Sequence, residues 1–218
     1  MRTRPQFRPA GVRSHPTVHK LLLAFALAAS CATAQAARPG CERWVAPVGV
    51  SASAIEATSS HAYHLLLQMD AAFKSSNPAS ARPLAVEFLS SVSTIPCDWN
   101  YGNAIHNANS VLGLLALHEG KKAEALTFLK ASSMSPGSPQ LNSYGPSLML
   151  AHELANVGEY DAVAQYVQNI GKFWNPDDTR AIALLLPFFK DPDLISTWLK
   201  KLQRHDVPDF GMNAKKSP

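Results

Sequence analysis

The sequence predicts an all-α protein of about eight helices, arranged as antiparallel hairpins. Apolar residues recur at helical spacing through residues 53–205. Glycine and proline interrupt this spacing at regular intervals, where helices are expected to end. No segment shows the alternation of apolar and polar residues between hairpin turns that is typical of strands.

Residues 1–36 have the pattern of a secretory signal peptide. A basic start without acidic residues precedes the apolar run at 21–29, and Ala34-Gln35-Ala36 matches a cleavage site. The run is shorter than the roughly 20 residues that a membrane span needs. We therefore expect an exported protein, periplasmic or secreted, with no transmembrane span in its mature part. Lipid attachment at Cys31 is the alternative.

Removing this leader changes the charge of the chain. The whole sequence has 20 basic and 16 acidic residues. Five of the basic residues lie in the leader, which leaves 15 against 16. A nearly neutral protein has no long-range field to attract phosphate backbones, so nucleic-acid binding is not expected.

Two cysteines, Cys41 and Cys97, remain after the leader. In an oxidising compartment two cysteines most simply form a disulfide. Two unpaired, partly buried thiols are the alternative. Neither cysteine lies in a C-x-x-C or haem-attachment motif, so redox catalysis and haem binding have no support.

The helices are expected to follow an irregular segment at 37–52. Ser53 and Glu56 form a possible capping box at the first helix start. Residues 206–218 are polar and are expected to be a frayed tail. The expected helices run from about 53 to 74, 83 to 92, 101 to 119, 121 to 133, 146 to 157, 160 to 173, 176 to 187 and 191 to 205.

Two of these hairpins share a pattern of small and large residues. The glycines that end their first helices, Gly120 and Gly158, are 38 positions apart. A small residue on each helix allows close approach of the backbones, and large neighbours fill the groove. The matched positions are Leu112, Gly113, Ala125 and Leu129 in the first hairpin, and Leu150, Ala151, Val163 and Val167 in the second.

This frame resembles the tetratricopeptide repeat, whose period is about 34 residues. The resemblance is best over residues 101–136 and 146–174, and periodicity extends it to a repeat domain over 53–205. Asn109 and Ala116 stand where the family often has tryptophan and tyrosine. The resemblance implies a right-handed superhelix with a concave face. An unrelated helical bundle is the alternative.

The family's geometry places the first helix of each hairpin on the concave face. A further candidate is the glycine- and proline-rich segment 137–146, which could form a rim that contacts a ligand. The alternatives are an ordinary solvated face and a stiff connector in which Asn142 and Ser143 cap the next helix. The resulting candidate binding residues are Asn107, Ser110, His118, Asn142, Tyr144, His152 and Asn156.

Motifs for catalysis or cofactor binding are weak. His61 and His64 have helical spacing that could serve a metal, but no further ligand is evident. His152-Glu153-Leu154-Ala155-Asn156 lacks the second histidine of a zinc-protease helix. We expect no metal and no cofactor. A hydrolase built from His106, Ser110 and Glu153 is conceivable, since catalytic sites are assembled in space.

These observations favour a non-catalytic binding or scaffold protein of the cell envelope. Its expected partner is a peptide or another protein, bound by the concave helical face. The alternatives are a small periplasmic hydrolase or polar-ligand-binding protein, and a structural homo-oligomer.

Overall fold

The computed structural model describes residues 41, 43–174 and 194–214. The predicted leader, which contains Cys31, and the helix expected at 176–187 lie outside the described residues. Within the described ranges the chain is helical and contains no strand, which confirms the all-α prediction. The α-helices are α2 (Ala52–Lys74), α3 (Ala81–Val92), α4 (Trp99–Asn103), α5 (Asn109–His118), α6 (Lys122–Ser133), α7 (Pro139–Tyr144), α8 (Met149–Asn156), α9 (Tyr160–Ile170) and α11 (Leu194–Gln203).

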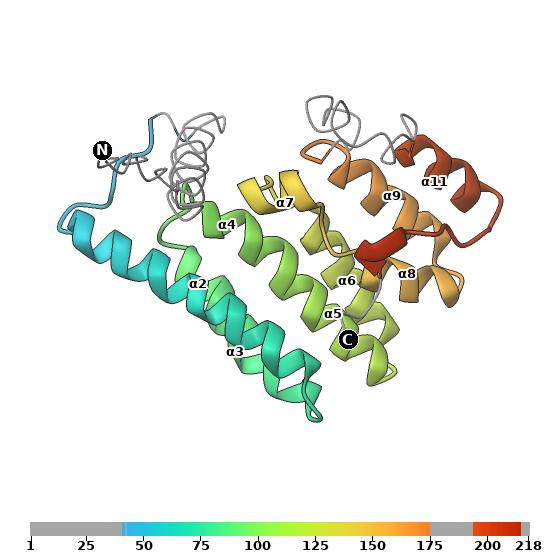
Figure 1. Cartoon of the computed structure of the whole chain (residues 1–218), viewed down its shortest axis with the longest axis horizontal. Helices are drawn as coiled ribbons and strands as arrows, with labels where there is room; N and C mark the ends of the chain where they lie inside the picture. Colours follow the sequence, from blue (N-terminus) through green and yellow to red (C-terminus); the bar gives the residue numbers. More distant parts are fainter. Residues whose placement is uncertain (1–40, 42, 175–193, 215–218) are drawn as a thin grey trace, which may run out of the picture.

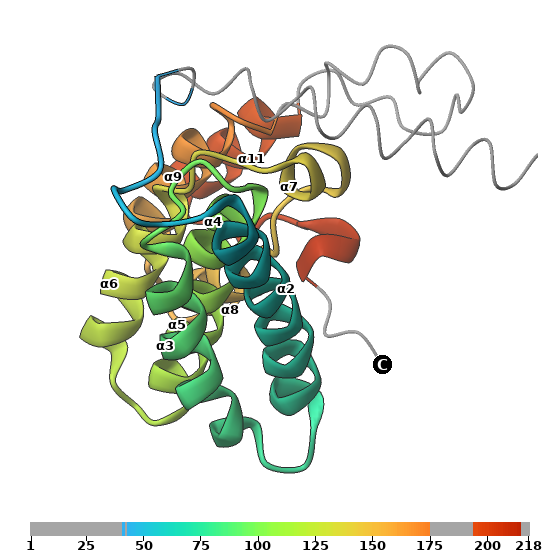
Figure 2. The ribbon, with the colours of Figure 1, turned by 90° about the vertical axis from the view of Figure 1, so that its left-hand side faces the viewer.

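Helices that follow one another along the chain pack side by side. α2 contacts α3, α5 contacts α6, and α8 contacts α9, which also packs on α11. Further contacts of α5 with α3 and α8, and of α6 with α9, join these pairs. The pairs succeed one another across the molecule in the order of the sequence (Figure 1). A view from the side shows the turn that joins α2 to α3 (Figure 2).

The two glycines of the repeat frame end α5 and α8 in the same way. Gly120 and Gly158 have φ angles of +75° and +87°, in the left-handed region that glycine tolerates best. In each case the glycine amide and the following amide donate hydrogen bonds to carbonyls of the last helical turn, at 2.8–3.0 Å. This is the Schellman arrangement, so the predicted helix ends are confirmed.

The small residues of the frame lie in the core. Ala125 and Ala151 are buried, and so is Gly113. A β-carbon at Gly113 would lie 2.3 Å from Leu150 Cδ2 and 3.1 Å from Phe128 Cβ. The close approach of α5 to α6 and α8 therefore depends on these small side chains. The superhelical handedness implied by the family resemblance stays a prediction.

A π turn connects α4 and α5. Residues Ala104–Ala108 form this wider turn, and α4, the π turn and α5 follow one another without an intervening loop from Trp99 to His118. One extra residue in a helical turn rotates the residues after it relative to those before it. Asn107, inside this turn, and the α5 residues after it consequently face different directions from those that uniform helical spacing predicts.

Two helix starts differ from the sequence prediction. Ser51, not Ser53, caps α2, because its side chain accepts a hydrogen bond from the Ala54 amide at 3.1 Å. In the segment expected to be a rim or connector, Ser138 caps the short helix α7 and Pro139 occupies its first position. Asn142 lies inside this helix, and α8 has no side-chain cap. The capping role predicted for Asn142 is wrong.

The segment 206–214 is not a frayed tail. Phe210 is buried, and Trp198 Nε1 donates a hydrogen bond to the carbonyl of Asp209 at 3.1 Å. The segment ends in a 3-10 turn, Gly211–Ala214, that contacts α8. Its polar composition suggested solvation, but a buried aromatic residue and backbone hydrogen bonds fix it to the helical body.

Cys41 and Cys97 form a disulfide, with their α-carbons 5.5 Å apart. The bond joins the segment that precedes α2 to the connection between α3 and α4. The pairing predicted from the sequence is therefore present in the structure. No helix within the described ranges is both long and apolar enough to cross a membrane.

Candidate functional site

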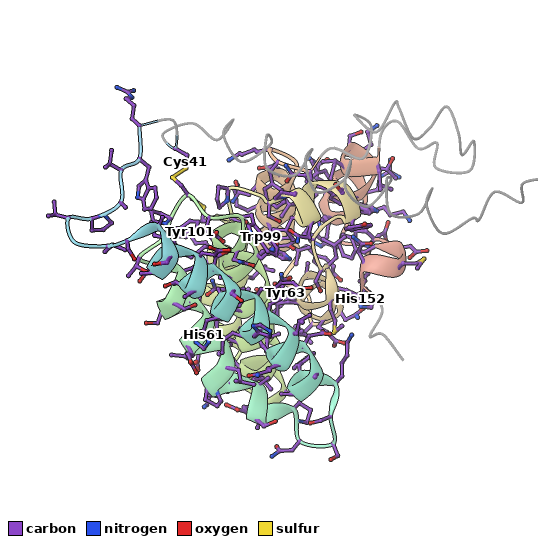
Figure 3. The ribbon with its side chains drawn as sticks, turned by 60° about the vertical axis from the view of Figure 1, so that its left-hand side comes forward. Cys41, His61, Tyr63, Trp99, Tyr101 and His152 are labelled. Atoms are coloured by element: carbon purple, nitrogen blue, oxygen red, sulfur yellow. A yellow bond between two sulfur atoms is a disulfide. The ribbon has the colours of Figure 1, made fainter. Side chains whose placement is uncertain are left out.

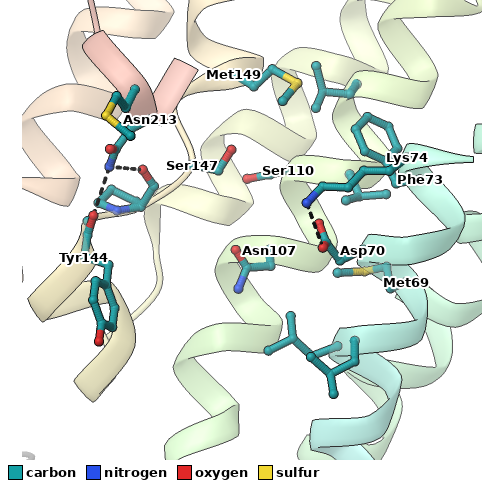
Figure 4. Close-up of a pocket in the computed structure, with 17 residues that line it drawn as sticks. Met69, Asp70, Phe73, Lys74, Asn107, Ser110, Tyr144, Ser147, Met149 and Asn213 are labelled. Atoms are coloured by element: carbon teal, nitrogen blue, oxygen red, sulfur yellow. Dashed lines mark hydrogen bonds and ion pairs between the residues drawn. The ribbon is translucent and has the colours of Figure 1, made fainter. Parts of the chain in front are cut away.

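A cleft of about 480 Å³ lies between the C-terminal half of α2, the helix α5 and the segment that leads into α8 (Figure 4). The 3-10 turn at 211–214 forms part of its wall. The cleft is thus built from the first helix of each of three consecutive pairs. Its lining residues are Leu66, Leu67, Met69, Asp70, Phe73, Lys74, Asn107, Ser110, Val111, Leu114, Tyr144, Gly145, Pro146, Ser147, Met149, Met212 and Asn213.

Apolar side chains form most of the cleft surface. Met69, Phe73 and Leu114 are buried, so they belong to the core as well as to the cleft. Leu67 and Met212 are 50% and 85% exposed and present large apolar groups to solvent. Methionine adapts its shape to varied partners. Such a surface can hold an apolar side chain without requiring one particular shape.

Polar groups stand at intervals along the same cleft. Asp70 and Lys74 are the charged side chains among the described residues that line the cleft, and they neutralise each other in an ion pair at 3.0 Å. The Ser110 hydroxyl donates to the carbonyl oxygen of His106 at 2.8 Å, and its remaining lone pair can accept a hydrogen bond. The half-buried Asn107 offers both a donor and an acceptor.

Hydrogen bonds from the C-terminal segment stabilise one wall of the cleft. Asn213 Nδ2 donates to the carbonyls of Tyr144 and Pro146 at 3.2 and 3.0 Å. The carbonyl of Asn213 accepts a hydrogen bond from the Leu148 amide at 2.8 Å. Three bonds from one residue fix the segment between α7 and α8. The segment predicted to be a frayed tail therefore shapes the site.

The structure brings together three of the seven predicted binding residues. Asn107, Ser110 and Tyr144 line the cleft. His118 is exposed at the end of α5 and Asn142 is exposed on α7, and neither lines the cleft.

His152 and Asn156 also lie away from the cleft. His152 is half-buried beside Phe210, with ring centroids 6.4 Å apart, and its Nδ1 lies 3.3 Å from Asn156 Nδ2. The C-terminal segment packs on α8, where an open concave face was expected.

The sequence prediction missed the contribution of α2. Asp70 and Lys74, together with the apolar residues around them, follow the spacing of a single helical face. That spacing was visible, but the repeat frame assigned binding residues only to the two best hairpins. Met149, Met212 and Asn213 had no recognisable signal in the sequence.

Ser110, His61 and His64, which are potential catalytic or metal-binding residues, each interact with a different group. The Ser110 hydroxyl donates to the backbone of His106 and makes no hydrogen bond with the imidazole ring. His61 pairs with Glu87 at 3.0 Å, whereas His64 Nδ1 lies 2.8 Å from the carbonyl of Ser60. Among the residues that the structure describes, no three His, Cys, Asp or Glu side chains gather in a way that could hold a metal ion.

His106 lies in the same π turn as Asn107, which lines the cleft. It is fully buried in the π turn, and its ring is 6.4 Å from that of Tyr166. The Tyr166 hydroxyl donates to the carbonyl of Ser147, which lines the cleft. Burial lowers the pKa of His106 from 6.5 to about 4, although the nearby backbone of Ser132 and Ser147 favours the protonated form. Neither ring nitrogen has a hydrogen-bond partner among the described residues.

This burial predicts that acid destabilises the fold. Because the folded pKa of His106 lies below the unfolded value, the unfolded chain binds more protons between pH 6.5 and about 4. The free energy of unfolding should therefore be highest above pH 6.5 and fall by about 3 kcal/mol as the pH drops to 4. Urea denaturation at a series of pH values measures this loss.

The control for this prediction is His106→Gln, which removes the titrating group but keeps a polar side chain. The variant is expected to be less stable at neutral pH and to lose less stability between pH 6.5 and 4. An equally steep loss in wild type and variant would show that other groups cause the acid sensitivity.

Comparisons with known proteins identify no family for this chain. The chain matches no protein-family model, no curated protein and no solved structure. The cleft is therefore interpreted from its own residues.

Proposed function

We propose that this chain is a non-catalytic binding or scaffold protein, exported from the cell, that holds a peptide segment of a partner protein in its cleft. The observation that carries the proposal is the composition of the cleft. Three successive helix pairs contribute to one surface that combines buried apolar walls with spaced hydrogen-bonding groups. The tetratricopeptide-like frame supports the same proposal.

The size and chemistry of the cleft suit a short stretch of extended chain. Its volume of 480 Å³ lies within the roughly 300–1,000 Å³ of typical ligand pockets. A peptide offers one N–H and one C=O at each residue. The amide of Asn107 can pair with either group, and the apolar walls can bury alternate side chains.

The electrostatics favour an uncharged segment at this position. Asp70 and Lys74 neutralise each other, and the other described residues that line the cleft are uncharged. Burial of apolar area would then supply most of the affinity, at about 25 cal/mol per Å² before the costs of association. Binding in the cleft should depend only weakly on salt concentration.

The disulfide supports the exported location. Disulfides persist in oxidising compartments such as the periplasm and the extracellular space. The bond between Cys41 and Cys97 is consistent with the leader predicted at residues 1–36.

The cleft can be tested by placing a charge in it. A peptide is first selected from a displayed library on the immobilised protein, and its Kd is measured by calorimetry. Leu67→Asp puts a carboxylate on the apolar wall at a residue that is 50% exposed, so folding should survive. We expect this variant to bind at least about ten-fold more weakly, which corresponds to about 1.4 kcal/mol.

Val86→Asp is the matched control. Val86 is a helical residue with 56% exposure, but it lies on α3 and does not line the cleft. The control should bind the selected peptide as wild type does. Equal affinity of wild type, Leu67→Asp and Val86→Asp would contradict the proposal.

A further inference from the structure

A second depression, which we call the hollow, lies on the N-terminal half of α2. It has a volume of about 420 Å³ and is lined by Ile55, Glu56, Ser59, Tyr63, Asp98 and Trp99, among others. The first four come from α2, and the last two from the start of α4. The disulfide at Cys97 lies next to this start and fixes the loop that carries it.

Two aromatic rings form an angled wall of the hollow. The ring centroids of Tyr63 and Trp99 are 5.5 Å apart, and their planes are tilted by 47° (Figure 3). Tyr63 is 40% exposed and Trp99 is half-buried. Asp98 caps α4 through the Asn100 amide at 2.8 Å, which fixes the position of Trp99 at the first residue of the helix. Trp99 is thus held in place before any ligand arrives, and both rings are partly accessible to solvent.

Acidic side chains line the hollow. Among the described residues around it, the charged ones are Glu56 and Asp98. Glu56 is exposed near the start of α2. Aromatic faces beside carboxylates attract an organic cation, and arginine is the protein side chain that stacks best on such faces.

The hollow and the cleft lie on the same face of α2. Lining residues continue from Glu56 through Ser59 and Tyr63 in the hollow to Leu67 and Asp70 in the cleft. Each step is three or four residues, which is the spacing of one helical face. The helical rise puts the middle of the hollow about 16 Å from the middle of the cleft. An extended peptide spans this distance with about five residues.

We propose that the hollow binds an arginine side chain of the same peptide whose apolar residue occupies the cleft. This inference rests on the proposed function, and it specifies the partner as a peptide with an arginine about five positions from an apolar anchor. The guanidinium stacks on the faces of Tyr63 and Trp99 and lies beside the carboxylate of Glu56. The cleft supplies apolar contact and the hollow supplies recognition of charge.

The hollow can be tested without the peptide. The probes are N-acetyl-arginine amide and N-acetyl-citrulline amide, which have nearly the same shape but differ in charge. Their binding to the full chain is followed by NMR of the tryptophan and tyrosine ring signals. We expect the arginine probe to bind at least about three-fold more tightly than the citrulline probe.

Two variants separate the hollow from the cleft. Glu56→Gln should remove most of the preference for arginine, whereas Glu124→Gln, an exposed glutamate on α6, should leave it intact. Leu67→Asp should not weaken binding of the arginine probe. Equal binding of the two probes to wild type, or an unchanged preference in Glu56→Gln, would overturn the inference.

The library peptides connect the two sites. Peptides selected on wild type should contain an arginine about five positions from an apolar residue, and those selected on Glu56→Gln should lack this enrichment. Selected peptides that depend on Leu67 but carry no arginine would overturn this inference and leave the proposed function standing. A preference for the arginine probe without any peptide that depends on Leu67 would instead contradict the proposed function.

Discussion

Replacing both Cys41 and Cys97 by serine is expected to lower the free energy of unfolding by about 4 kcal/mol. The disulfide closes a loop between residues 56 positions apart, and the unfolded chain gains conformational freedom when this loop opens. The backbone hydrogen bonds recorded for residues 43–50 are local, from Trp44 to Cys41 and from Val50 to Pro47. Neither of these hydrogen bonds joins the segment to the helical body, whereas the disulfide does. Urea denaturation followed by circular dichroism measures the loss.

Reduction supplies the control for this prediction. Dithiothreitol should destabilise wild type by about the same amount and should leave the double serine variant unchanged. A double variant as stable as oxidised wild type would show that the helical body holds this segment without the bond. A further loss on adding dithiothreitol to the variant would show that the reductant acts on another part of the chain.

Replacing Gly102 by alanine is expected to destabilise the fold by about 4 kcal/mol or more, above the usual range for an inserted methyl group. A β-carbon at this position would lie 1.8 Å from the carbonyl oxygen of Gly137, which is a backbone atom and cannot rotate away. The Ser135 hydroxyl also donates to the Gly102 carbonyl at 2.8 Å. The variant must separate α4 from the loop before α7 and break this contact.

Gly171→Ala is the matched control for this substitution. A β-carbon there would meet its nearest atoms at 3.5 Å, which is ordinary contact. Its free energy of unfolding should change by less than about 1 kcal/mol. Comparable losses at Gly102 and Gly171 would contradict the close approach of α4 to the 135–138 loop.

The helix pairs could be predicted from the sequence because local chemistry determines them. Gly120 and Gly158 supply the left-handed conformation at two helix ends, and Gly113, Ala125 and Ala151 allow close packing. These signals depend on a residue and its near neighbours in the chain. They can therefore be recognised in a single sequence without any knowledge of the tertiary fold.

The remaining features depend on contacts between distant residues. The π turn at 104–108 changes the direction of the side chains that follow it, and none of its residues is characteristic of such a turn. The C-terminal segment is polar, and contacts with distant helices fix its position. Phe210 packs against Trp198 of α11 and His152 of α8, and Asn213 donates a hydrogen bond to the carbonyl of Tyr144. The predicted residues His118, Asn142, His152 and Asn156 do not line the cleft.

The buried polar residues near the π turn were not predicted either. Asn103 and Ser138 are buried together, with the Ser138 hydroxyl donating to Asn103 Oδ1 at 2.6 Å. Asn169 Nδ2 donates to Ser133 Oγ at 3.0 Å in the same part of the molecule. In the sequence these residues are typical of loops and helix caps. Only the fold pairs them across 35 and 36 positions of sequence.

NMR mapping of a bound peptide tests the central claim most directly. Isotope-labelled protein is titrated with a library-selected peptide, and shifts of the backbone amides are followed. The claim predicts the largest changes at Leu67, Asn107 and Met212, with little change at His118 and Asn156. Changes centred on those two residues, or spread evenly over the helices without reaching Leu67, would show that partners bind elsewhere.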